Sequence, residues 1–367
     1  MTIARQSIHT ADRSHPTLPP DVAATITARA AELDSSPRFP REDIEGLARA
    51  GLLALPSLGG VGLAALLRAV GRCNLSVGRL YEGHINAASL IDHFGTAAQR
   101  QRLLADCAAG RLHAVWNTDA TDPVALVPAP GGRWRLAGRK ILASGAGEIE
   151  RPLVTATLPA GERQMVLLHL PRGDRADLAA WTAQGMRASL TGSVDLSGLE
   201  VTTEDLFGAP GDYLREPDFS GGAWRFAAVQ LGGAEALAQA LRDDLTASGR
   251  QSDPHQAGRF AEIAAALETG RLWVEEAARR MERGTDASED LVAYVNLARL
   301  EVERVCLLVL DRAERSIGLR AFLRPHPVER IGRDLSTYLR QPAPDRARMV
   351  AAERLLGADR PIACFWG

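Results

Sequence analysis

The chain contains little cysteine, almost no net charge and no long apolar run, and each shortage argues against a class of protein. Cysteine occurs only 4 times in 367 residues and never as a CxxC pair, so neither a zinc site nor a redox dithiol is indicated and no metal is expected. The formal net charge of −2 gives no reason to expect nucleic acid or an acidic membrane surface as partner. No run approaches the ~20 apolar residues of a membrane span, and the first residues lack the apolar core of a signal peptide. These absences predict a cytoplasmic protein.

The composition is that of a globular protein that is too long for one ordinary core. Apolar residues make up 46% and charged residues 24% of the chain, so two or three packed units are expected. Shifts in pattern divide the chain into a mobile N-terminal arm, a helical domain, a β domain and a C-terminal helical bundle, at residues 1–20, 21–112, 113–210 and 211–367.

Helices are predicted wherever apolar residues recur every three or four positions between capping signals. One segment begins at Pro40 with acids in its first turn and stops at Gly51, which is a typical helix signature. The other predicted helices cover residues 22–33, 63–70, 78–94, 97–108, 223–248, 256–283, 288–317 and 345–356.

The middle of the chain carries alternating apolar and polar residues between glycines, which predicts β structure. Residues 134–146 are predicted to form a hairpin that ends in a loop of small residues. Residues 185–201 repeat this pattern, and Gly198 predicts a bulge or bend between two strands.

Four motifs in this order resemble the acyl-CoA dehydrogenase superfamily. They are the Phe94-Gly95 helix, the predicted hairpin, residues 186–196, and residues 326–334, which read HPVERIGRD. The resemblance implies an α+β fold with an N-terminal helical domain, a middle antiparallel β domain and a C-terminal helical bundle. It also implies that FAD is held between the β domain and the bundle.

The resemblance assigns cofactor contacts to two groups of residues. Trp116, Thr118 and Ser144 match the loops that hydrogen-bond the flavin ring in the family. Arg250 matches an arginine that contacts the pyrophosphate, and the segment of Arg315 and Gly318 replaces a glycine-rich loop. Such loops often reach a neighbouring subunit, so a homodimer or homotetramer is implied, and the apolar faces of residues 223–248 and 288–317 are expected to form its interface.

The two positions where the family carries its catalytic glutamate hold Pro342 and Trp224, and neither side chain can accept a proton. Dehydrogenation of ordinary acyl-CoA thioesters by the usual base is therefore disfavoured. Glu82 and His84 lie on the helix that matches the family's pocket-lining helix, so they are the candidate substitutes. The alternative is that both are surface or satisfied helix residues without a catalytic role.

Three functions remain open on this resemblance. The first is an FAD-dependent oxidoreductase acting on an acyl-CoA-like or specialised small substrate. The second is a flavin-dependent monooxygenase, because residues 333–342 have the length of the corresponding monooxygenase segment, with Gln341 where a histidine would stand. The third is a non-catalytic binding or assembly protein.

Overall fold

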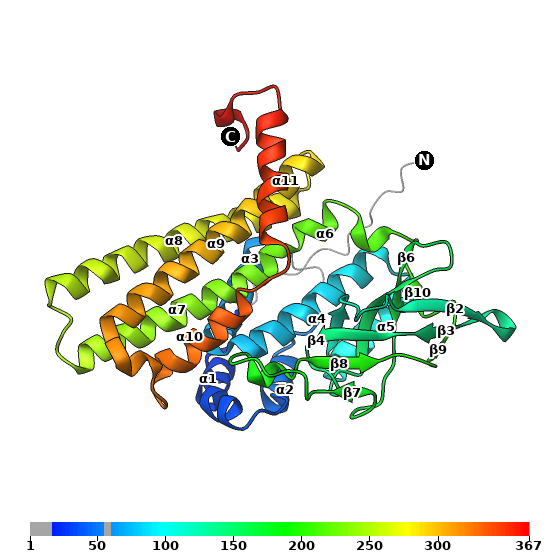
Figure 1. Cartoon of the computed structure of the whole chain (residues 1–367), viewed down its shortest axis with the longest axis horizontal. Coiled ribbons are helices and arrows are strands. Elements are labelled where there is room, and N and C mark those ends of the chain that lie inside the picture. The colour runs from blue at the N-terminus through cyan, green and yellow to red at the C-terminus, as the bar shows by residue number, and fades with distance from the viewer. Residues whose placement is uncertain (1–16, 55–59, 367) are drawn as a thin grey trace.

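The computed structural model describes residues 17–54 and 60–366, so most of the predicted N-terminal arm lies outside the described residues. Helices come first, two β-sheets follow and a second set of helices ends the chain. Figure 1 shows the long C-terminal helices on one side of the molecule, the sheets on the other and helix α4 between them. The predicted fold class is confirmed.

The N-terminal helices are α1 (Pro20–Ser35), α2 (Arg41–Arg49), α3 (Gly60–Cys73), α4 (Leu75–Phe94) and α5 (Ala97–Ala108). Side chains fix two of their starts. Asn74 accepts the backbone N–H groups of Ser76 and Val77 at the start of α4. Thr96 and Gln99 form a reciprocal capping box at the start of α5.

The β domain contains two sheets in the described part of the chain. The larger has the order β10-β6-β5-β2-β3-β9, with β1 beside β5, and the smaller has the order β4-β8-β7. Most neighbours are antiparallel, but β1 and β2 run parallel to β5. The strands are β1 (His113–Trp116), β2 (Ala125–Ala129), β3 (Arg133–Ala137), β4 (Arg139–Ala143), β5 (Arg151–Thr157), β6 (Arg163–Leu167), β7 (Ala176–Asp177), β8 (Gly192–Asp195), β9 (Glu200–Val201) and β10 (Leu206–Phe207).

The prediction of a hairpin at residues 134–146 is wrong. Strand β3 pairs with β2 and β9, whereas β4 pairs with β8 in the other sheet. Gly138 lies between them with φ of 115°, a conformation that favours glycine. Gly198, with φ of 81°, marks the return from β8 to β9. The two glycines therefore bend the chain from one sheet to the other, and the predicted bend at Gly198 is present.

The C-terminal helices are α6 (Asp218–Gly221), α7 (Ala223–Ala247), α8 (Pro254–Arg283), α9 (Ser288–Ile317), α10 (Pro327–Tyr338) and α11 (Pro344–Gly357). Helix α7 packs against α3, α8, α9 and α10, so its apolar face is covered within one chain. That packing removes the reason for expecting α7 to form an interface between subunits. None of the helices among the described residues is long and apolar enough to cross a membrane.

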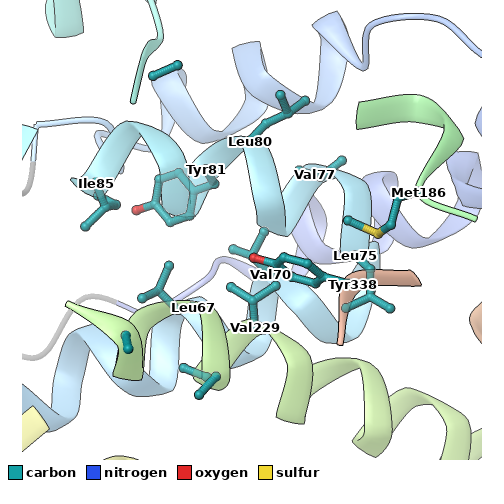
Figure 2. Close-up of a cluster of buried hydrophobic side chains, with 14 of the residues drawn as sticks. Leu67, Val70, Leu75, Val77, Leu80, Tyr81, Ile85, Met186, Val229 and Tyr338 are labelled. Carbon is teal, nitrogen blue, oxygen red and sulfur yellow. The ribbon is translucent and has the colours of Figure 1, made fainter. Parts of the chain in front are cut away.

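Helix α4 is the element that joins the three parts, since it contacts β1, α7 and α10. Figure 2 shows the core around it, where Leu80 and Ile85 of α4, Val229 of α7 and Tyr338 of α10 gather. Helix α3 approaches α7 so closely that a Cβ on Gly71 would lie 2.3 Å from the carbonyl oxygen of Val229. Glycine is required there, and the close contact holds the bundle against the N-terminal domain.

Candidate active site

A cavity of about 440 Å³ opens between α4, α6, α7, α8 and α9. Trp224, in the first turn of α7, and Pro342, in the connection from α10 to α11, both line it. The two positions that the resemblance assigns to a catalytic base, 118 residues apart in the sequence, thus meet at one cavity, and neither provides an acid. Val115 of β1 also lines the cavity, so the chain runs directly from its wall to the loop that holds Thr118.

Hydrogen-bond donors dominate the less exposed wall of this cavity. Arg225 Nη1 donates to Asn86 Oδ1 over 3.1 Å, and Arg299 Nη2 donates to the carbonyl oxygen of Pro342 over 2.9 Å. The Nε atoms of Trp224 and Arg225 are buried and have no acceptor among the described residues. Burial lowers the pKa of Arg225 and of Arg299, because a low-dielectric environment disfavours their charge.

The acidic groups of the cavity lie nearer its mouth. Asp92, His93 and Glu282 line it and are exposed. Asp218 of α6 is half-buried, and its Oδ2 lies 3.6 Å from His93 Nε2. Sequence reasoning missed this pair because Asp218 lies in a Gly- and Pro-rich stretch without a helical or strand pattern. Its position six residues before Trp224 was the available signal.

Glu82 is buried beneath the cavity wall and does not line it. Its carboxylate forms an ion pair with Arg79 and accepts a hydrogen bond from the side-chain amide of Asn86. Asn86 in turn accepts from Arg225. Glu82 therefore stands one residue away from the cavity and acts on it through Asn86, which makes it a positioning residue.

His84 has no ring nitrogen left for a substrate. Its Nε2 lies 2.8 Å from the carbonyl oxygen of Leu53, and its Nδ1 accepts the backbone N–H of His113 over 3.0 Å. The ring is fully buried, which lowers its pKa to about 3 and keeps it neutral. These contacts give His84 a structural role and leave neither ring nitrogen for acid–base chemistry.

The β-domain residues assigned to the flavin ring lie in different environments, and none of them lines the cavity itself. Trp116 is buried, and its only side-chain donor, Nε1, binds the carbonyl oxygen of Ser144 over 3.0 Å. The indole therefore holds the Ser144 loop and has no donor for a cofactor. Thr118 is exposed, and its hydroxyl has no partner among the described residues. Leu142 is 57% exposed at a φ of 53°. A free hydroxyl beside an exposed apolar side chain fits a flavin ring, which has a polar and an apolar edge.

A buried ionic network fixes the Thr118 loop. Lys140, the only lysine in the chain, donates to Asp119 over 2.6 Å, and Arg163 binds the other oxygen of Asp119 over 2.6 Å. Lys140 is fully buried, and burial lowers its pKa to about 8. The carboxylate of Asp119 thus fixes the loop through one contact from each of its oxygens.

The residues assigned to the pyrophosphate lie at the far end of the bundle, where α7 and α9 end. Arg250 binds Asp244 and the carbonyl oxygen of Ser316, each over 2.9 Å, and Arg320 also binds Asp244. Arg315 pairs with Asp311, and Gly318 caps α9 with φ of 73°. Figure 1 shows this end of the bundle on the side opposite to the β domain. One chain therefore cannot bring both groups of predicted cofactor residues together.

Two helical domains around a pair of β-sheets, with a cavity where the three parts meet, define the class of protein. Residues 22–111 match the N-terminal domain of acyl-CoA dehydrogenases, and residues 224–340 match the C-terminal domain. The chain therefore belongs to the acyl-CoA dehydrogenase family, whose members are flavin-dependent oxidoreductases.

Known proteins of two kinds resemble the chain. It is 26% identical over 332 residues to the short-chain specific acyl-CoA dehydrogenase of Clostridium acetobutylicum, covering 83% of this chain and 86% of that protein. It is 24% identical over 378 residues to the dibenzothiophene monooxygenase of Mycolicibacterium goodii, covering 90% and 91%. The structure of FMN-bound TdsC from Paenibacillus sp. A11-2 superposes with a TM-score of 0.82 at 20% identity, covering 95% of this chain and 98% of that one. At this identity the superposition shows the fold alone.

Proposed function

We propose that the protein is a flavin-dependent monooxygenase that acts on a small substrate. The observation that carries the proposal is that Trp224 and Pro342 line the cavity at both positions where a dehydrogenase of this family would carry its base. Removal of an α-proton needs a carboxylate within hydrogen-bond reach. Oxygen transfer from a reduced flavin needs no such base, and a relative 24% identical to this chain is a monooxygenase.

The residues of the chain would bind and orient the reactants. Thr118 would supply an exposed hydroxyl group to the ring, and the Lys140–Asp119 pair holds its loop in place. Ser144 would supply a second hydroxyl group, which is buried and accepts a hydrogen bond from Thr191. The buried indole of Trp224 excludes water from the cavity wall. A bound reduced flavin would supply the two electrons needed for O₂ to give one oxygen atom to the substrate and one to water.

The experiment compares two ways of using the flavin. We expect oxygen consumption when reduced flavin is supplied, faster with a productive substrate, and no rapid bleaching of the bound flavin by butyryl-CoA without oxygen. Rapid anaerobic bleaching would instead show a dehydrogenase. A purified protein that binds no flavin would favour the third interpretation, a non-catalytic member of the fold.

Dehydrogenation remains the second candidate because Asp218 places one carboxylate on the cavity wall, beside His93. If butyryl-CoA bleaches the flavin, Asp218→Asn should slow the bleaching by roughly 10²–10⁴-fold, which is the usual contribution of general-base catalysis. Asp243→Asn is the matched control, since Asp243 lies on the exposed face of α7.

For the cofactor we propose FAD, bound across two subunits. Asp244 is surrounded by Arg250, Arg320 and His326, so positive charge remains at this end of the bundle for a pyrophosphate. Because this end lies opposite the β domain in one chain, only a second chain could bring it to the flavin. We expect Arg250→Gln to weaken the binding of FAD and to leave the binding of riboflavin unchanged, and equal effects on both would contradict the assignment.

The proposed assembly is a homodimer or homotetramer, through faces other than that of α7. Exposed apolar side chains gather on η4 (Gly318–Phe322) and along α11, where Leu319 and Leu356 are 75% and 87% exposed. In Figure 1, α11 projects away from the rest of the bundle. Light scattering should show a dimer or tetramer that Leu319→Asp or Leu356→Asp weakens, and a monomer of the unaltered protein would contradict this proposal.

A further inference from the structure

The cavity wall formed by α7 and α9 carries positive charge without a matching carboxylate. Neither Arg225 nor Arg299 has a carboxylate oxygen within 4.0 Å among the described residues. The other arginines of α9 behave differently: Arg304, for example, binds Glu301. Two guanidinium groups thus line one cavity, each bonded only to an uncharged oxygen.

Hydrogen bonding leaves donors unused on the same wall. Arg225 Nε and Trp224 Nε1 are buried without an acceptor, and a buried donor left unpaired costs about 1–3 kcal/mol. Arg225 donates one N–H to Asn86, and Arg299 donates one N–H to the carbonyl oxygen of Pro342. Each guanidinium group carries five N–H donors, so most of them remain available. The wall therefore offers several donors and needs an acceptor that the protein does not provide.

The carboxylates of the cavity do not meet this need. Asp92 and Glu282 are exposed, and Asp218 faces His93. Glu82 is the nearest buried carboxylate, but Arg79 and Asn86 occupy it. Water could accept these hydrogen bonds, but only an anionic ligand would also balance the two positive charges at close range.

We propose that Trp224, Arg225 and Arg299 form an anion-binding subsite that holds a carboxylate or a similar oxyanion of the substrate. The inference rests on the proposed function, in which this cavity receives the substrate. Guanidinium groups bind planar oxyanions through paired hydrogen bonds, and an anion would offset the cost of burying the two positive charges. The substrate class is thus a small organic acid, since about 440 Å³ lies at the lower end of ligand cavities, roughly 300–1,000 Å³.

The test uses matched pairs of acids and amides on the purified protein, with and without its flavin. Propionate, hexanoate and benzoate are compared by calorimetry with propionamide, hexanamide and benzamide, which have the same shapes without the charge. We expect at least one acid to bind about tenfold or more tightly than its amide, since a hydrogen bond to a charged group contributes about 1.5–3 kcal/mol. Equal binding of all pairs, or no binding of any acid, would overturn the proposal.

Single substitutions test whether the preference for acids over amides depends on Arg225 and Arg299. Arg225→Gln and Arg299→Gln should each remove it, and Arg225→Lys should keep part of it because the charge remains. Arg242→Gln on α7 and Arg304→Gln on α9 are the controls, since both side chains lie on exposed faces of the same helices. Melting temperatures of all variants identify loss of folding. A preference that survives in folded Arg225→Gln and Arg299→Gln would overturn the proposal.

A phosphate of the cofactor is the competing occupant of this wall. If Arg225→Gln and Arg299→Gln weaken FMN binding and spare riboflavin, the guanidinium groups serve the cofactor and the substrate assignment is wrong. The subsite and the proposed function can also fail separately. Acid binding without oxygen consumption would support the anion-binding subsite and contradict the monooxygenase proposal. Oxygen consumption with neutral substrates and no acid binding would support the monooxygenase proposal and contradict the subsite.

Discussion

Lys140 Nζ lies 2.6 Å from Asp119 Oδ1, and this pair joins the only lysine of the chain to the loop that carries Thr118. We expect Lys140→Met to lower the free energy of unfolding by about 1–3 kcal/mol, because Asp119 loses a charged hydrogen bond in a buried site. Flavin affinity should fall with it. Urea unfolding and flavin titration measure both effects. Arg139→Gln is the control, since Arg139 is half-exposed and its ion pair with Asp195 is long, at 3.9 Å. Unchanged stability in Lys140→Met would show that Arg163 alone holds the loop.

The burial of Lys140 predicts that it is protected from chemical labelling in the folded protein. Lys140 is fully buried, so an amine-acylating reagent should leave its peptide unmodified in the native protein and modify it in urea. Mass spectrometry of the digested protein measures the fraction labelled. Rapid labelling under native conditions would mean that the network opens frequently.

Helix packing gives a stability prediction with an internal control. Gly71→Ala should destabilise the protein by about 1–3 kcal/mol, since the new Cβ forces α3 away from the backbone of Val229. Gly258→Ala on α8 should instead stabilise it by about 0.5–1 kcal/mol, because nothing lies within 4 Å of that Cβ and alanine favours the helix. Opposite signs in chemical unfolding are the expected result, and equal effects would contradict the close approach of α3 and α7.

The buried His84 predicts a loss of stability in acid. Its pKa falls from 6.5 to about 3 on folding, so the unfolded chain binds a proton first as the pH drops below 6.5. Stability should therefore fall by about 1.4 kcal/mol for each pH unit in this window. Asp43 and Asp334, whose pKa values burial raises to about 6, act in the opposite direction below that pH.

The His84 effect is isolated by comparing pH profiles. His84→Gln should be less stable at neutral pH but should lose less stability between pH 6.5 and pH 5 than the unaltered protein, because it has no ring to protonate. If the two proteins lose stability in parallel as the pH falls, the pKa of His84 does not change on folding.

The sequence predicted the order of domains and most helices because apolar spacing and caps are local signals. The predicted range 288–317 coincides with α9. The hairpin failed because strand partners are set by contacts distant in the sequence. Strands β3 and β4 are adjacent in the chain, yet Gly138 sends them to different sheets. The motif at residues 326–334 forms the start of α10, and its His326 cap and Pro327 are local signals of a helix start.

The candidate site was only partly predictable, for the same reason. Trp224 and Pro342 were found by matching positions, and the structure brings both to one cavity. The unpaired state of Arg225 and Arg299 could not be predicted, because it depends on which carboxylates fail to reach them across helices. Glu82 was chosen for its place on α4, but its partners Arg79 and Asn86 decide its role.

Glu82 provides the last prediction. If it were the base that replaces the missing glutamate, Glu82→Gln would abolish any oxidation of acyl-CoA. Because it instead holds Asn86, which accepts from Arg225, we expect Glu82→Gln to weaken substrate binding and to leave the maximal rate of oxygen consumption nearly unchanged. Steady-state kinetics separate these effects, since loss of binding alone raises KM, whereas loss of a chemical group lowers kcat. Glu301→Gln is the control, since its carboxylate pairs with Arg304 on α9 and Glu301 does not line the cavity. A fall in kcat of roughly 10²-fold or more is the size expected for a lost general base. That result would indicate that Glu82 acts as a base and would contradict its assignment as a positioning residue.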